Sequence, residues 1–298
     1  MVAGVLFSFL ASACFSVSNL MEKQAVTGMA EITVRHVGHL FRALCSSRVW
    51  LTGFVISVVS IGITIVAYSL APIMIVQTIM GAGLALLVLA SRLYLHEPLG
   101  QKERLGLVTI IVAVVLVSLT LNSTAVAPHI SVPEVLAVSA ATVVIAGAAF
   151  GVLHRRTFHD ASLMFGSTSG LLYGIAALQM KSISVLLEQH GLLGGITRVL
   201  ASPYPYLFVG ASLLGLIIFQ SGLQRCRISV VGPVTNIVAS VYVVVVGGAI
   251  FHESLPRETD LTLLRLLGFA FVLVGSLIFA TGPATPAGVV ASSATPDE

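Results

Sequence analysis

The 298-residue chain has little charge and few cysteines. Only 9% of its residues are Asp, Glu, Lys or Arg, against about 25% in soluble proteins. Because most of a soluble fold's exterior must face water, this shortage excludes ordinary cytosolic and secreted folds. A clustered basic face is also missing, which excludes nucleic-acid binding. The widely spaced Cys14, Cys45 and Cys226 indicate neither a disulfide framework nor a metal cluster.

Long apolar runs are what the sequence has instead. Hydrophobic residues make up 57% of the chain, and its mean hydropathy is +1.04. A helix satisfies its own backbone groups in lipid and crosses the hydrocarbon core with roughly 20 residues. The predicted fold class is an all-α polytopic membrane protein with about nine transmembrane helices. The spans are expected at 2–21, 50–70, 72–91, 105–122, 134–153, 161–180, 203–223, 228–251 and 265–282, with Pro72 as the break between the second and third.

The placement of Lys and Arg predicts the orientation. Most of them lie in the first, third, fifth and seventh connections between the spans, and few lie in the others. Connections rich in Lys and Arg stay in the cytoplasm. We therefore expect a multi-pass protein of the cell membrane with its N-terminus outside and its C-terminus in the cytoplasm.

Two segments are expected to lie outside the spans. In residues 30–46, Val34 and Phe41 share one helical face while Arg35 lies on the other. This pattern predicts an amphipathic helix in the membrane interface, and a tenth span is the alternative. Residues 283–298 are rich in Pro, Ala, Ser and Thr, which is typical of a disordered tail.

The two halves of the chain share charged and polar positions in register. Residues 95–99 (LHEPL) match residues 251–255 (FHESL). An arginine opens the next span in each half, and an aromatic residue lies eight positions before a lysine near the end of the first span. These pairs are Arg104 with Arg265, Phe15 with Tyr173, and Lys23 with Lys181.

The register of these matches predicts two four-helix repeats joined by one linking helix. Residues 1–122 would form the first repeat, 134–153 the link and 161–282 the second repeat. An odd number of crossings separates equivalent helices, so the repeats must run in opposite directions. Inverted repeats of this kind are typical of secondary transporters, whose substrate site lies between the repeats near the midplane.

With these motifs the chain resembles the drug/metabolite transporter superfamily of EamA type. Within it, residues 67–72 (AYSLAP) followed by Val76 are similar to a motif of the NIPA-like magnesium transporter branch, as is Gln220 followed by residues 231–234 (VGPV). The resemblance implies a carrier of small solutes or ions with about nine or ten spans. The branch has an acidic residue and an asparagine in the span before the first motif, where this chain has Ile61 and Thr64.

The predicted interior is polar but lacks acids, because no Asp or Glu lies in the middle of a span. A Mg²⁺ ligand or a proton relay would favour a buried carboxylate, whereas neutral groups suit hydrogen bonding to an organic solute. The residues expected to bind substrate are Asn19, Tyr68, Gln77, Tyr173, Gln220 and Asn236. Hydrogen bonding between helices is the alternative role of Gln77 and Asn236.

Charged groups at span ends are candidates for gating. They are Lys23, Lys181, Glu97 and Glu253. For the lysines, the alternative is an anchoring role in which the side chain reaches the membrane surface. No catalytic motif, cofactor or metal site is indicated, so we do not expect an enzyme.

The sequence favours a secondary transporter that moves a small organic metabolite or amphipathic compound by alternating access. The first alternative is a magnesium or other divalent-cation permease of NIPA-like type. The second is a non-transporting membrane partner or a subunit of a lipid-carrier translocase. The expected partners are a small-molecule or ion substrate and the lipid bilayer, and a homodimer stays open.

Overall fold

A computed structural model describes most of the chain. The described residues are 2–27, 46–83, 85–86, 101–120, 131–154, 161–225, 228–252 and 258–280. Almost all of the expected interfacial helix and the whole of the expected tail lie outside them. Within the described ranges every regular element is a helix.

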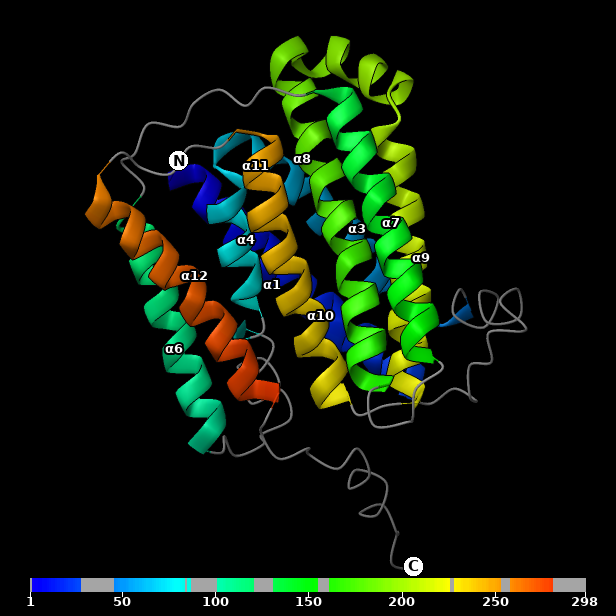
Figure 1. Ribbon diagram of the computed structural model, residues 1–298, viewed down its shortest axis with the longest axis vertical. Coiled ribbons are helices and arrows are strands. Elements are labelled where there is room, and N and C mark those ends of the chain that lie inside the picture. Colours follow the sequence, from blue (N-terminus) through cyan, green and yellow to red (C-terminus); the bar gives the residue numbers. More distant parts are fainter. Residues whose placement is uncertain are drawn as a thin grey trace, which may run out of the picture.

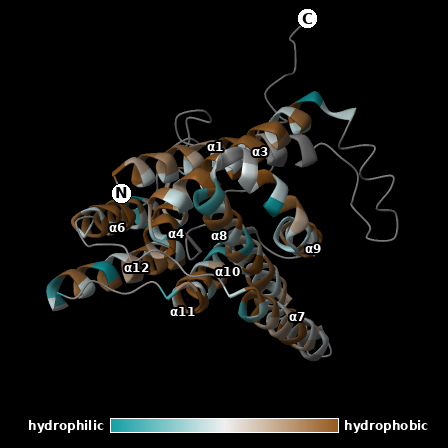
Figure 2. Cartoon of the chain, turned by 90° about the horizontal axis from the view of Figure 1, so that it is seen from above, coloured by the Kyte–Doolittle hydropathy of each residue, from teal (hydrophilic) through white to brown (hydrophobic). Residues whose placement is uncertain are grey.

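The helices form one bundle, with α4 and α10 between a pair formed by α6 and α12 and a group formed by α7, α8 and α9 (Figure 1), while α1 and α3 pack together along one side (Figure 2). The elements are α1 (Val2–Thr27), α3 (Arg48–Leu70), α4 (Ile73–Gly81), α6 (Gln101–Ser118), α7 (Val132–His154), α8 (Ala161–Ala201), α9 (Tyr204–Arg225), α10 (Ile228–Tyr242), the π-helix η3 (Val243–Gly247), α11 (Gly248–Ile250) and α12 (Thr259–Ala280).

The exterior of the bundle is apolar, as a membrane protein requires. Within the part of the chain that the structure describes, five helices are long and apolar enough to cross a membrane, within α3, α8, α9, α10–α11 and α12, and α1, α6 and α7 contain shorter apolar stretches. Seen from above, the helices are hydrophobic over most of their length (Figure 2). The predicted class of an all-helical polytopic membrane protein is thus supported, while the number of nine spans stays a prediction.

Local sequence explains both ends of α3. At its start the Ser47 hydroxyl accepts a hydrogen bond from the Trp50 N–H at 3.3 Å, which caps the first turn. At its end Pro72 disfavours helical backbone in the preceding residue, and Ala71 is extended with φ −146° and ψ 154°. The chain reverses there and continues as α4, so the expected break at Pro72 is present.

Helix α8 is longer than the sequence predicted. We expected its span to end at about residue 180, but the helix continues past Lys181, and its apolar span extends to Gly191. Gly191 has φ +70°, a conformation that glycine adopts without steric cost, and it turns the chain so that the last part of α8 runs across the top of the bundle (Figure 1).

Helix α4 is the centre of the bundle. Its described side chains are nearly all buried, including Ile73, Ile75, Val76 and Ile79. It contacts α1, α3, α6, α10, η3 and α12. A helix that is buried on all sides cannot face lipid, so any polar side chain on α4 must find its partners inside the protein.

Close helix contacts depend on small residues and on hydroxyl groups. A Cβ atom on Gly268 of α12 would lie 3.0 Å from the Ala113 backbone oxygen of α6. Between α1 and α3, the Ser60 hydroxyl donates to the Ala11 oxygen at 2.8 Å and the Ser18 hydroxyl donates to the Gly53 oxygen at 2.8 Å. Small residues let helix backbones approach closely. Such packing holds membrane helices together, because the surrounding lipid is as apolar as their side chains.

The expected linking helix corresponds to α7, which packs against α8. Two side-chain hydrogen bonds fasten it. The Gln179 amide nitrogen donates to the Ser139 hydroxyl at 2.9 Å, and the hydroxyls of Thr142 and Tyr242 are 2.8 Å apart. Because all four groups are buried, each bond replaces one that water would otherwise supply.

The contact between α6 and α12 yields a stability prediction. Gly268→Ala should lower the free energy of unfolding by about 1–3 kcal/mol, because the new methyl group would lie 2.6 Å from the stiff Val117 side chain and 3.0 Å from the Ala113 backbone oxygen, which cannot move aside. Gly210→Ala is the matched control, since nothing lies within 4 Å of a Cβ at that position. Thermal unfolding in detergent would measure both, and equal effects would contradict the close contact.

Candidate functional site

Polar side chains from four helices meet at the buried helix α4. We call this set the polar cluster, and its members are Tyr68 of α3, Gln77 of α4, Asn236 and Ser240 of α10, and Ser276 of α12. Three of them, Tyr68, Gln77 and Asn236, are among the substrate-binding residues predicted from the sequence. Helices from both halves of the chain contribute, so packing, rather than local sequence, assembles the cluster.

One part of the polar cluster is a chain of hydrogen bonds across α4. The Tyr68 hydroxyl donates to Gln77 Oε1 at 3.3 Å, and Gln77 Nε2 donates to the Ser240 hydroxyl at 3.2 Å. All three side chains are buried, with Gln77 9% exposed. The Gln77 amide thus connects α3 and α4 to α10.

The other part lies between α10 and α12. Asn236 Nδ2 donates to the Ser276 hydroxyl at 3.4 Å. Gly81 of α4 lies next to both parts, because a Cβ there would be 3.8 Å from Ser240 Oγ and 3.9 Å from Asn236 Nδ2. The absence of a side chain at Gly81 therefore brings the backbone of α4 close to the polar groups of α10.

The polar cluster carries no acid. Every Asp and Glu whose side chain the structure describes is exposed, namely Glu134, Glu188, Glu258 and Asp260. In the described part of the chain, no group of three or more His, Cys, Asp or Glu side chains could hold a metal ion. Thr64, where the NIPA-like branch has asparagine, donates its hydroxyl to the Ser60 oxygen of its own helix. The groups available for binding are therefore neutral amides and hydroxyls.

Lys181 is buried inside the bundle. Its side chain is 3% exposed, and its ammonium group donates to the backbone oxygens of Tyr68 at 2.8 Å and Ala71 at 3.4 Å. The anchoring role in which this lysine reaches the surface is therefore wrong. Tyr68 therefore makes two contacts: its hydroxyl donates to Gln77, and its backbone oxygen accepts from Lys181.

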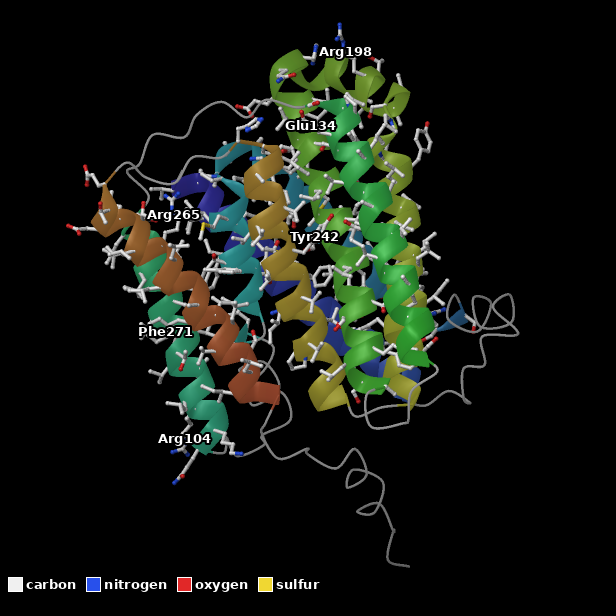
Figure 3. The ribbon with its side chains drawn as sticks, in the orientation of Figure 1. Arg104, Glu134, Arg198, Tyr242, Arg265 and Phe271 are labelled. Atoms are coloured by element: carbon white, nitrogen blue, oxygen red, sulfur yellow. The ribbon has the colours of Figure 1, made fainter. Side chains whose placement is uncertain are left out.

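Arg265 is the other basic side chain that the structure describes as buried. It is 3% exposed, and it donates from Nε to the Thr120 hydroxyl at 3.2 Å and from Nη2 to the Thr120 backbone oxygen at 3.0 Å. Its cation thus lies at the carboxyl end of α6, where the backbone dipoles favour positive charge. Arg104, its counterpart in sequence, is exposed at the opposite end of the bundle (Figure 3).

The remaining predicted residues are not all brought together. The Tyr173 ring lies against α9, edge-on to Phe219 with the ring centroids 6.3 Å apart. Gln220 lies on α9 and is partly exposed. The side chains of Asn19 and Lys23, and the whole of Glu97 and Glu253, lie outside the described residues, so their binding and gating roles stay predictions.

Sequence analysis missed Ser240, Ser276 and the contact made by Arg265. Ser240 lies 163 positions from Gln77, and serine is too common in transmembrane helices for its position alone to indicate a partner. A local signal did exist for one feature. Pro72 follows Tyr68 by four residues, which predicts that the Tyr68 oxygen lacks its helical donor.

Comparison with known proteins supports a transporter. The chain is 26% identical over 253 residues to the "Probable magnesium transporter NIPA9" of Arabidopsis thaliana, and the match covers 81% of this chain and 72% of that protein. No protein-family model and no solved structure matches. The chain is thus a distant homologue of a NIPA magnesium transporter, in agreement with the NIPA-like resemblance. Membership of the drug/metabolite superfamily stays a prediction.

The hydrogen-bond chain across α4 can be tested by its coupling energy. In a double-mutant cycle, Gln77→Ala and Ser240→Ala should couple by about 0.6 kcal/mol and by no more than about 1.7 kcal/mol, the range for bonds between membrane helices. Ser221→Ala, which removes a hydroxyl bonded to Ile217 of its own helix, should not couple to Gln77→Ala. Unfolding in detergent measures each variant, and additive effects of the first pair would count against the bond.

Proposed function

We propose that the protein is a membrane transporter that moves magnesium or another divalent cation through the bundle at the polar cluster. The observation that carries this proposal is the homology to a probable magnesium transporter over four-fifths of the chain. The polar cluster is the candidate place because helices from both halves meet there around the buried α4.

An interior without described acids is compatible with this cargo if the ion keeps water. Mg²⁺ dehydrates reluctantly and usually retains several water ligands when proteins bind it. Those waters donate hydrogen bonds, so the protein must offer acceptors rather than direct metal ligands. The amide oxygens of Gln77 and Asn236 and the hydroxyls of Tyr68, Ser240 and Ser276 are acceptors of this kind.

The transport mechanism that we propose is alternating access between two inverted repeats. Packing supports it: α1 contacts α3 and α4 as α8 contacts α9 and α10, and α4 contacts α6 as α10 contacts α12. Figure 3 also supports it, because Arg104 and Arg265 lie at opposite ends of the bundle. In sequence, Thr120 follows Arg104 by 16 residues and Thr281 follows Arg265 by 16 residues, which extends the register of the repeat.

The proposed orientation has the N-terminus outside and the C-terminus in the cytoplasm. Lys102 and Arg104 are exposed at the start of α6, which this orientation places on the cytoplasmic side. Positive charge retained in the cytoplasm is the physical basis of this assignment. On the same basis, the buried Arg265 lies near the outer side.

A small organic solute is the second candidate cargo. It is favoured by the neutral character of the polar cluster, because amides and hydroxyls bind uncharged or zwitterionic polar groups without any loss of ionic hydration. The two candidate cargoes would bind the same residues but are different solutes. One flux assay can therefore separate them.

Proteoliposomes that enclose a magnesium-sensitive dye test the proposal. We expect external Mg²⁺ to raise the dye signal faster than in protein-free vesicles. Gln77→Ala should lower the initial rate about tenfold, the factor that corresponds to about 1.4 kcal/mol of lost binding. Gln179→Ala is the matched control, because it removes the same amide from a buried position that faces α7.

Three other outcomes would contradict the proposal in different ways. A normal rate in the Gln77→Ala protein would remove the polar cluster from the pathway. Flux of a polar metabolite without Mg²⁺ flux would favour the organic cargo. An absence of flux for every solute tried, in a protein that unfolds cooperatively, would favour the non-transporting membrane partner.

A further inference from the structure

The break between α3 and α4 removes the helical donors of the Tyr68 and Ala71 backbone oxygens. In a helix, the oxygen of residue i accepts from the N–H of residue i+4. For Tyr68 that residue is Pro72, which has no N–H. For Ala71 it is Ile75, whose N–H donates to the Pro72 oxygen instead, at 3.1 Å. Both oxygens need another donor, because they lie in the apolar core.

The donor that reaches these oxygens is a cation from the other half of the chain. The Lys181 ammonium lies 2.8 Å from the Tyr68 oxygen and 3.4 Å from the Ala71 oxygen. Tyr68 and Ala71 belong to an apolar core cluster that also includes the buried Ala67, Leu178 and Ile183. Two carbonyl oxygens that point at one positive charge next to an unwound segment are the arrangement in which carriers bind free monovalent cations.

We propose that the break between α3 and α4 is a monovalent-cation site that Lys181 fills with its own ammonium group. The site then admits a free sodium, potassium or small alkylammonium ion only when Lys181 is shortened. A tethered cation does not dissociate, so the wild-type protein needs no added monovalent ion at this place. This inference concerns the break itself and goes beyond the question of what the protein carries.

The geometry also makes Lys181 a positioning residue for the polar cluster. It holds the backbone of Tyr68, and the hydroxyl of the same residue donates to Gln77. The start of α1 lies against the break, because a Cβ on Gly4 would be 2.7 Å from the Ala71 Cβ. The ammonium thus holds a break against which α1 also packs, and removing it should loosen this region unless another cation replaces it.

The test measures thermal unfolding of the full-length protein in detergent, in choline, sodium, potassium or methylammonium chloride at one ionic strength. The wild-type midpoint should not depend on the cation. Lys181→Ala should unfold at a lower temperature in choline, and methylammonium, sodium or potassium should raise its midpoint in a saturable way, on the order of 2–5 °C. Methylammonium supplies the ammonium and one carbon of the missing side chain.

Two matched variants make the test specific. Arg198→Ala removes an exposed cation from the same helix and should show no dependence on the cation. Adding Pro72→Ala to Lys181→Ala gives position 72 an N–H that can bond to the Tyr68 oxygen, so the dependence on the cation should disappear. Persistence of that dependence in the double variant would place the cation site elsewhere.

The proposal is overturned if the Lys181→Ala protein unfolds at the same temperature in all four salts. It is also overturned if no folded Lys181→Ala protein can be recovered in any of them, because a filled site should hold the fold. The readout is stability and not flux. A failure of the proposed magnesium transport would therefore leave this result unchanged, and the two proposals can fail separately.

Discussion

Backbone oxygens that lose their helical donors inside an apolar bundle must find other donors, and this constraint explains the two buried cations. Pro72 removes the donor of the Tyr68 oxygen, and the Thr120 oxygen lies two positions past the last residue of α6, Ser118. Lys181 and Arg265 donate to these two oxygens. Both cations come from the second half of the chain and both acceptors from the first. These hydrogen bonds to backbone oxygens therefore also join the two halves.

The polar cluster depends on this arrangement. Lys181 fixes the backbone at Tyr68, and Tyr68 presents its hydroxyl to Gln77 on the buried α4. Gln77 in turn reaches Ser240 of α10. The helix break thus removes the helical donor of the Tyr68 oxygen and orients the Tyr68 side chain. It also places α4 so that the Gln77 amide can reach the second half of the chain. The same proline that interrupts the helix therefore organises the candidate site.

Sequence reasoning identified what local chemistry determines. Apolar runs predicted the helices, Pro72 predicted the break, and the repeat placed Tyr68, Gln77 and Asn236 near one another. It did not identify what distant packing determines. The continuation of α8 beyond Lys181, the π-helix at Val243–Gly247, and the choice of Ser240 as partner of Gln77 have no local signal. A lysine between apolar stretches is normally interpreted as the end of a span. Hydropathy does not show that a helix break elsewhere in the chain supplies acceptors for a buried lysine.

Hydrogen bonds between α1 and α3 are shorter than those within the polar cluster, so the helix framework is rigid and the polar cluster is adaptable. Hydroxyls that fasten α1 to α3 donate to backbone oxygens at 2.8 Å, the usual distance for such bonds. The side-chain bonds within the polar cluster are 3.2–3.4 Å long, close to the limit at which such bonds still form. Long neutral bonds are weak, so a ligand that offers better geometry can replace them at little cost. Groups that satisfy one another weakly and can exchange partners are what a carrier needs, since it must bind its cargo and release it.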